Sequence, residues 1–314
     1  MKRKVVKHGN ATLTLSLPIK WAKKYGIKQG DELEIEERAN SLIVQTGKAL
    51  FSEAKTIDIT GLSEMVIWRV IDAAYRSGAE EIRITFSDEG PKSTKFSEKK
   101  NITILDYVRL IVDRLIGMEI ISQGKTFCII REISSIKEEE FENVLRRIFM
   151  YIGNMFNDSM DAINKDDRIL LKNLSDNIDS PLNKLVRYCL RYINKGYLEP
   201  REASALYYII SQLEEIGDSI VFILRTISEM KKPLRKGIIG LFHETSGLFG
   251  MMHKTFYKFG IKEFSEVYSE RAEIKEKIAS LKNLPEQEIK IAGALKMVSN
   301  YAIEIINTKM IESI

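Results

Sequence analysis

Residues 200–228, PREASALYYIISQLEEIGDSIVFILRTIS, decide the fold of the larger part of this chain. An apolar residue recurs there at every third or fourth position: Leu206, Ile209, Leu213, Ile216, Ile220, Ile223 and Ile227. An apolar seam with this period is typical of a helix buried in a bundle. Pro200 suits the first turn of such a helix, because the N–H that proline lacks would have no partner there.

The sequence on both sides of this stretch predicts five further helices. Ser135-Ile136-Lys137-Glu138 fits a capping box, and an apolar face runs on from Phe141 to Ile163. A second helical stretch covers about 166–194 and ends at Gly196, and Pro181 should kink or divide it. Three more helices are predicted after the quoted stretch, over about 233–259, 261–282 and 285–310.

These six helices read as two copies of three. Residues 213–224 (LEEIGDSIVFIL) align with residues 295–306 (LKMVSNYAIEII), and each segment lies in a helix entered through a proline. Internal similarity of this kind indicates a duplicated unit. The sequence therefore predicts two three-helix repeats, at about 135–230 and 232–314.

The phrase Leu213-Glu214-Glu215-Ile216-Gly217-Asp218 resembles the third-helix motif of the PhoU family of phosphate-uptake regulators. The resemblance implies two three-helix repeats and a metal site where an acidic residue is followed four positions later by Asp. Glu214 and Asp218 fit this pattern, and their spacing places both carboxylates on one helix face. Asp176 and Asp179 are further candidate ligands, at a spacing of three.

Oxygen ligands of this kind suit iron, magnesium or another hard cation better than zinc. The second repeat departs from the pattern, since Lys296 and Asn300 occupy the equivalent positions. The alternative interpretation of Glu214 and Asp218, an ordinary solvated acidic face, stays open.

The N-terminal segment is basic and β-rich. Residues 1–30 contain no acid and these basic residues: Lys2, Arg3, Lys4, Lys7, Lys20, Lys23, Lys24 and Lys28. Such a segment on a nearly balanced body indicates a polyanionic partner. Leucines alternate with hydroxyl residues over 12–17, which predicts a half-buried strand, and Pro18 leads into a short helix over 19–25 that Gly26 ends. Further strands are predicted at 32–36 and 42–44.

This segment, residues 1–47, resembles the AbrB/SpoVT family of swapped-hairpin DNA-binding domains. The resemblance rests on Lys7 and Gly9, Leu17-Pro18, Trp21, Tyr25-Gly26-Ile27, Gly30-Asp31 and Ser41-Leu42-Ile43. It implies an interlaced dimer in which Lys2, Arg3, Lys4 and Lys7 contact DNA, flanked by Lys20, Lys23 and Lys24. We expect Trp21 to pack in the core of this domain rather than to stack on bases.

Residues 50–133 are predicted to form a small α+β domain with no catalytic constellation. Strands are expected at 56–59, 81–86, 119–122 and 126–131, with helices at 64–77 and 104–116 and a polar loop at 87–101. Gly124 and Lys125 predict a hairpin turn between the last two strands. No phosphate loop, nucleophile elbow or metal-binding spacing occurs. A spacer or dimerisation role is the simplest interpretation.

Taken together, the sequence predicts a multidomain α+β protein. A swapped-hairpin β domain (1–47) and a small α+β domain (50–133) precede an all-α pair of three-helix bundles (135–314). No apolar run approaches the ~20 residues of a membrane span, no signal peptide is recognisable, and Cys128 and Cys189 are too few for a disulfide framework. We therefore expect a cytoplasmic protein without membrane insertion.

The predicted function is DNA-binding transcriptional regulation of phosphate uptake or metabolism, with duplex DNA and a second copy of the chain as partners. An AbrB-like head on a PhoU-like body also resembles an archaeal arrangement of phosphate-uptake regulators. One alternative is an adaptor that contacts a phosphate transporter or signalling kinase. Another, an enzyme built on a metal-carboxylate bundle, is disfavoured because neither His243 nor His253 follows a Glu by three positions. We expect no enzymatic activity.

Overall fold

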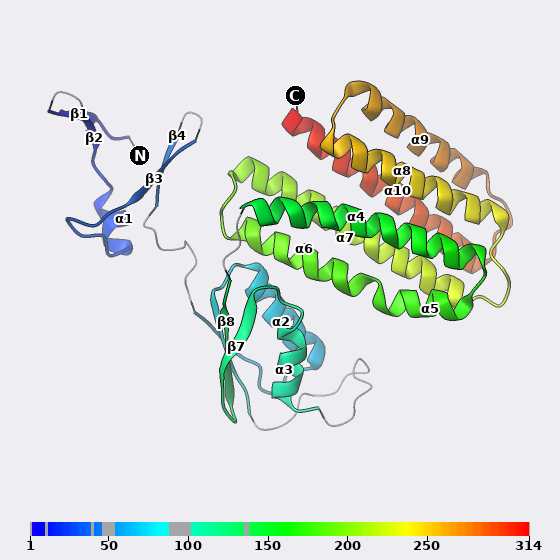
Figure 1. Ribbon diagram of the computed structural model, residues 1–314, viewed down its shortest axis with the longest axis horizontal. Helices are drawn as coiled ribbons and strands as arrows, with labels where there is room; N and C mark the ends of the chain where they lie inside the picture. The colour runs from blue at the N-terminus through cyan, green and yellow to red at the C-terminus, as the bar shows by residue number, and fades with distance from the viewer. Residues whose placement is uncertain are drawn as a thin grey trace. The chain divides into compact units, whose positions relative to one another are not determined.

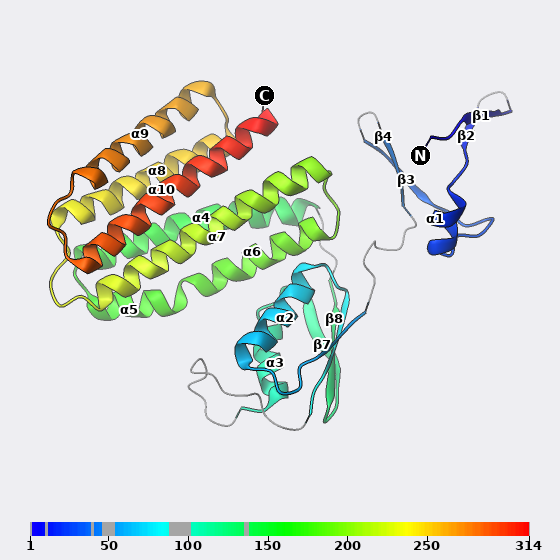
Figure 2. The same cartoon turned by 180° about the vertical axis from the view of Figure 1, so that it is seen from behind.

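The computed structural model describes residues 2–9, 12–38, 41–45, 54–87, 102–134 and 138–313. The chain divides into two compact units, Met1–Ser52 and Glu53–Ile314, which are drawn in Figures 1 and 2. Residues 135–137 of the predicted capping box and most of the predicted loop at 87–101 lie outside the described residues. The domain boundary predicted within the second unit stays a prediction.

The first unit consists of two antiparallel hairpins and a short helix. Strand β1 (Val5–His8) pairs with β2 (Thr12–Leu15), and β3 (Glu34–Arg38) pairs with β4 (Ser41–Gln45). Helix α1 (Ile19–Lys24) lies between the hairpins and ends before Gly26, whose φ of +66° favours glycine. The sequence missed β1, because its valines do not alternate with polar residues.

The first unit buries none of its described residues. Leu13 is 71% exposed, Leu15 57% and Leu17 37%. The alternating leucines of β2 therefore have no core to enter within one chain. A unit of this size buries little surface by itself, and these leucines need a covering surface from outside it.

The second unit begins with a four-stranded sheet covered on one face by two helices. The strands are β5 (Lys55–Asp58), β6 (Glu81–Thr85), β7 (Met118–Gln123) and β8 (Phe127–Glu132), in the order β5-β6-β8-β7. Helices α2 (Glu64–Arg76) and α3 (Ile104–Val112) lie against the sheet (Figure 1). Strands β5 and β6 are parallel because α2 connects them, whereas β7 and β8 form the predicted antiparallel hairpin.

The sheet and its two helices enclose a hydrophobic core of their own. Ile67 and Tyr75 of α2 pack with Ile84 of β6 and Cys128 of β8, all fully buried. Helix α3 ends earlier than predicted, at Val112 rather than at Ile116. The chain leaves the α-helix there through two tight turns, in which the N–H groups of residues 114 and 115 donate to carbonyls three residues earlier.

A helical bundle follows the sheet, and its described residues form seven helices instead of the predicted six. They are α4 (Glu138–Asn164), α5 (Arg168–Asn177), α6 (Asp179–Asn194), α7 (Pro200–Ser228), α8 (Lys236–Tyr257), α9 (Ile261–Ser280) and α10 (Glu286–Ser313). The extra helix arises because the stretch predicted at 166–194 is divided at Ile178, one turn before Pro181.

The helices of the bundle share one hydrophobic core. Helix α7 packs against α10, and α4 packs against α8 (Figures 1 and 2). Every apolar position predicted in the seam of α7 is buried. Phe149 and Phe156 of α4 contact Phe249 of α8, with ring centroids 6.3 and 5.5 Å apart. The phenylalanines therefore join the two predicted repeats through their first helices.

An ionic junction joins the α+β part to the bundle. The fully buried guanidinium of Arg191 in α6 donates to the carbonyl of Tyr75 at 2.7 Å, lies 4.9 Å from the Tyr75 ring and pairs with Glu132 of β8 at 3.3 Å. One turn later, Lys195 also pairs with Glu132. Because buried charges require partners, α2, β8 and α6 are held to one another.

Candidate functional site

The basic residues predicted to contact DNA are all solvent-exposed. Lys2, Arg3 and Lys4 precede β1, Lys7 lies within it, and Lys20, Lys23 and Lys24 lie on α1. In the described part of the chain no carboxylate pairs with any of the seven, although Lys24 lies 5.2 Å from the ring of Tyr25. Unpaired surface cations are available to neutralise phosphates. Trp21 is half-buried beside the Tyr25 ring, with centroids 5.6 Å apart.

A carboxylate face lies on the bundle, formed by Glu214 and Asp218 of α7 with Asp179 of α6. Burial, and then the charge of Asp218, raises the pKa of Glu214. Burial, and then the charge of Asp179, raises the pKa of Asp218. Asp218 therefore lies near enough to Glu214 and to Asp179, the other two acids proposed as metal ligands, for their charges to interact. Asp176 lies on the exposed side of α5, and no described contact joins it to them.

Sequence reasoning missed the cations beside this face. The Nε of Arg187 lies 2.9 Å from Oδ1 of Asp72, a buried carboxylate of α2, and its guanidinium lies 4.9 Å from the Trp68 ring. Arg76 pairs with the other oxygen of Asp72 at 3.0 Å. Both arginines lower the pKa of Glu214 against the effect of burial. A signal was present in the sequence, since Arg187, Arg191 and Lys195 recur every four residues along one face of α6.

The carboxylate face fits a weakly held hard cation better than a closed metal centre. Glu214, Asp218 and Asp179 supply the oxygen chemistry that such cations prefer. However, the described residues hold no group of three or more such side chains close enough to coordinate one ion. Water would therefore have to complete the shell, and the positive charge of Arg187 would compete with the ion. The metal site stays a prediction.

The second repeat uses its equivalent positions differently. Asn300, which replaces Asp218, accepts a hydrogen bond from Nη2 of Arg271 in α9 at 2.8 Å. Lys296 replaces Glu214 and is exposed. His243 is exposed, and the ring of His253 stacks on Phe149 with centroids 4.8 Å apart. In the described residues these histidines therefore occupy surface and packing positions.

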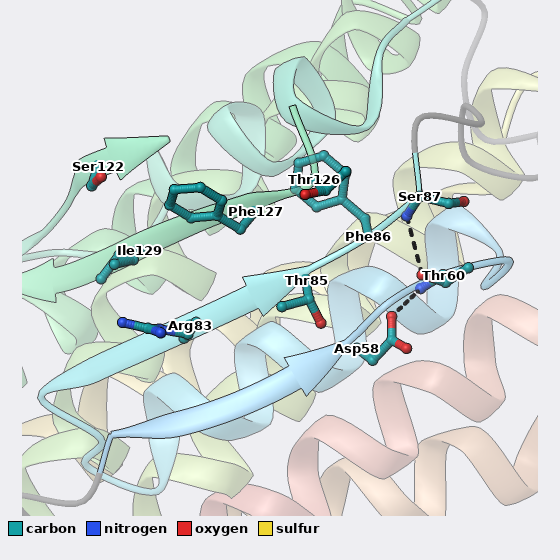
Figure 3. A pocket seen from close by; sticks show the side chains of 10 residues that line it. All are labelled: Asp58, Thr60, Arg83, Thr85, Phe86, Ser87, Ser122, Thr126, Phe127 and Ile129. Carbon is teal, nitrogen blue, oxygen red and sulfur yellow. Dashed lines mark hydrogen bonds between the residues drawn. The ribbon is translucent and has the colours of Figure 1, made fainter. Parts of the chain in front are cut away.

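A hollow of about 720 Å³ lies on the face of the sheet away from α2 and α3 (Figure 3). Phe127 and Ile129 of β8 stand beside Arg83 and Thr85 of β6 there. At one end, the N–H of Thr60 donates to Asp58 at 2.9 Å. Antiparallel strand pairs commonly present one face to water. The side chain of Thr60 also hydrogen-bonds to Asp58, which lowers the pKa of that carboxyl.

Two protein families match this chain. Residues 6–49 match MazE, described as antidote-toxin recognition MazE, bacterial antitoxin. Residues 145–227 match the PhoU domain. No curated protein matches the chain.

These matches define a class: a multidomain protein with a MazE/AbrB-like head in front of a helical PhoU domain. They confirm the predicted arrangement and indicate a regulatory role. The PhoU match ends at residue 227, close to the end of the first predicted repeat. In the described part of the chain, no helix combines the length and apolarity that crossing a membrane requires.

Proposed function

We propose that the protein is a DNA-binding transcriptional regulator of phosphate uptake or metabolism, whose head binds duplex DNA as a dimer. The observation that carries this proposal is the surface of the first unit. Seven exposed cations lie there without described carboxylate partners, in a segment that matches MazE. Phosphate neutralisation by Lys and Arg supplies most non-specific affinity for DNA. The phosphate assignment rests on the PhoU match.

The exposed leucines of β2 support the dimer. Leu13 and Leu15 are more than half exposed in one chain. A second copy of the chain that packs against them would remove this apolar surface from water, which is favourable. Replacing both with aspartate should convert a dimeric full-length chain to a monomer, because charges cannot be buried in an apolar interface. Sedimentation velocity measures the change. A wild-type chain that sediments as a monomer at micromolar concentration would contradict the proposal.

The salt dependence of DNA affinity tests the DNA interface. Removing one cation that neutralises a phosphate should reduce the slope of log affinity against log salt by roughly 0.9. We expect Lys4→Ala with Lys7→Ala to weaken binding of any duplex and to flatten this slope. The matched control is Lys262→Ala with Lys275→Ala, which removes the same charge from exposed positions of α9. Equal slopes for the two double variants would place the interface elsewhere.

The regulated genes require a cellular measurement. Mapping the DNA bound in cells grown with scarce and with ample phosphate would show whether occupancy follows phosphate and lies at genes for its uptake. The adaptor alternative, contact with a phosphate transporter or kinase, predicts no site-specific occupancy. It also leaves the basic head without a role.

A further inference from the structure

A groove between α4 and α6 is lined by hydrogen-bond donors and cations. Its volume is about 410 Å³, within the usual range of small-molecule sites. Helix α4 contributes Arg147, Tyr151 and Asn154, which lie on one helix face, and α6 contributes Lys184. Ile116, in the turn after α3, lies at the same groove. The groove therefore lies at the seam between the α+β part and the bundle.

The cations of this seam fall into two groups. Arg187, Arg191 and Lys195 are paired with carboxylates, as buried structural charges must be. Arg147 and Lys184 are different, because among the described residues neither has a carboxylate partner. Lys184 donates to the backbone carbonyl of Asp113 at 2.9 Å, which fixes its ammonium and leaves the charge uncompensated. Arg147 and Lys184 line the same groove.

The neutral polar groups of the groove add donors. Burial raises the pKa of Tyr151, and Asp158 and Asp179 raise it further, so that the phenol keeps its proton near neutral pH. The described contacts leave the phenol and the carboxamide of Asn154 without a hydrogen-bond partner, and neither acid lines the groove. The neighbouring hollow along β7 shares Ile116 and Lys184 with the groove and contains Asp113 and Glu119, whereas Arg147 lines the groove and not that hollow.

From these features we propose that the groove binds a small oxyanion of the phosphate type, free or as a monoester. Two cations and two neutral donors without a lining carboxylate match a ligand that carries several acceptor oxygens and a double negative charge. Arg147 would hold two oxygens through its planar fork, and Lys184 would act as a point charge. Met150 and Leu185 provide apolar wall for the organic part of a monoester.

The position of the groove gives binding a structural consequence. Ile116 accepts a hydrogen bond from the phenol of Tyr75 at 3.0 Å, and Lys184 contacts the end of α3, so the groove adjoins both hydrophobic cores. An anion held between α4, α6 and this turn ties the two parts together. It should therefore raise the melting temperature of the chain, and the gain should grow with the logarithm of the ligand concentration once this exceeds the Kd. The inference stands on the groove alone and not on the proposed DNA-binding function.

Calorimetric titration of the full-length chain tests the proposal, at constant ionic strength and in a buffer without phosphate. The probes are inorganic phosphate, sulfate and glycerol 3-phosphate, which separate free phosphate, a bare divalent anion and a monoester. We expect one site for phosphate or its monoester. Arg147→Gln and Lys184→Gln should each weaken it at least about tenfold, because each loses a charge-assisted hydrogen bond.

Arg146→Gln is the matched control, since the Arg146 guanidinium lies 5.1 Å from the ring of Tyr257 and outside the groove. It should leave the affinity unchanged, and anion binding by the basic head is the same in all three variants. The proposal is overturned if no probe binds at a concentration tenfold above a Kd of roughly 1 mM. Equal affinity in Arg147→Gln and wild type, or an equal loss in Arg146→Gln, also overturns it. DNA affinity of the same variants is measured separately and should not change, so each idea can fail alone.

Discussion

The two helical repeats share a buried core and differ at their surface. Leu213 of the first repeat and its counterpart Leu295 are both fully buried. One residue further on, Glu214 is replaced by Lys296. Core positions resist change because the loss of buried methylene groups leaves a cavity, whereas a position outside the core can change its charge without leaving one. The two repeats therefore bury equivalent apolar residues and differ in the charged residues outside the core.

The difference follows what each repeat packs against. In the first repeat, Arg187 of α6 pairs with Asp72 of the α+β part. In the second, Arg271 of α9 is bonded to Asn300 within the same repeat. The charges of the first repeat thus connect two parts of the chain, and the charge of Arg271 holds two helices of one repeat together. Three predictions test this contrast.

Breaking the ionic junction should have the largest effect. Arg191→Ala leaves Glu132 without its buried guanidinium and the Tyr75 carbonyl without a donor. Removing one partner of a buried pair typically costs about 3–5 kcal/mol, and because Lys195 still pairs with Glu132 the loss should lie near the lower end, at about 3 kcal/mol. We expect this loss in the free energy of unfolding, measured by urea denaturation.

The matched variant in the second repeat is Arg235→Ala. Arg235 pairs with the buried Glu288 at 3.0 Å, but its own side chain is 49% exposed. Glu288 also keeps the backbone N–H of residue 235 as a donor, so the loss should be only about 1–2 kcal/mol. Equal losses in the two variants would show that the junction with the α+β part gives the first repeat no special stability.

The packing of α6 against α7 should produce the second largest effect. A Cβ at Gly217 would lie 2.2 Å from Cδ2 of Leu182, a side chain only 1% exposed. Gly217→Ala should therefore destabilise by about 1–3 kcal/mol through overpacking. Helix propensity alone predicts the opposite sign, a gain of up to about 1 kcal/mol.

Ser299 occupies the equivalent position of the second repeat. It is buried, so the packing there already accommodates a side chain. Its hydroxyl donates to the carbonyl of Lys296 at 2.8 Å. Ser299→Ala should cost no more than about 1 kcal/mol, the net value of one hydrogen bond. Thermal unfolding of both variants measures the difference. A stabilised Gly217→Ala variant would show that α6 and α7 do not approach as closely as described.

The helices were predictable because their determinants are local. Apolar periodicity predicted the buried positions of α7 from Leu206 to Ile227, and Pro181 correctly indicated a divided helix. The ionic junction was not predictable, since Asp72 and Arg187 are far apart in sequence and only the fold brings them together. Asp72 lies in a helix that reads as ordinarily amphipathic. Long-range pairs of this kind leave no periodic signal in a single sequence.

The candidate sites were predictable to different degrees. The basic residues of the head could be selected from an acid-free segment, and the structure shows them exposed. Glu214 and Asp218 were selected because they match the acidic pattern that the resemblance to PhoU implies, and four residues make about one helical turn, which places both on one face. Their relation to Arg187 and the groove at Arg147 depend on how α4 and α6 pack, which residue spacing along one helix does not encode.

The smallest effect on stability, and the most specific one on binding, is expected at the carboxylate face. Asp218→Asn keeps the side-chain volume and removes one of two like charges a turn apart, so it should stabilise α7 by a few tenths of a kcal/mol. If a hard cation binds there, the same change should abolish metal uptake while helix content, measured by circular dichroism, stays constant. Asp176→Asn is the matched control, because it removes the same charge from the exposed side of α5.

Elemental analysis after loading with iron, manganese or magnesium decides between a metal site and a polar face. We expect at most the first repeat to be occupied, because the second presents a lysine and an amide that already accepts from Arg271. Metal should then be present in the wild type and in Asp176→Asn and absent from Asp218→Asn. Equal metal in all three, or none in any, would make Glu214 and Asp218 an ordinary acidic surface. The repeats would then differ in charge alone, and the pairing of Arg187 with Asp72 would remain the feature that distinguishes the first.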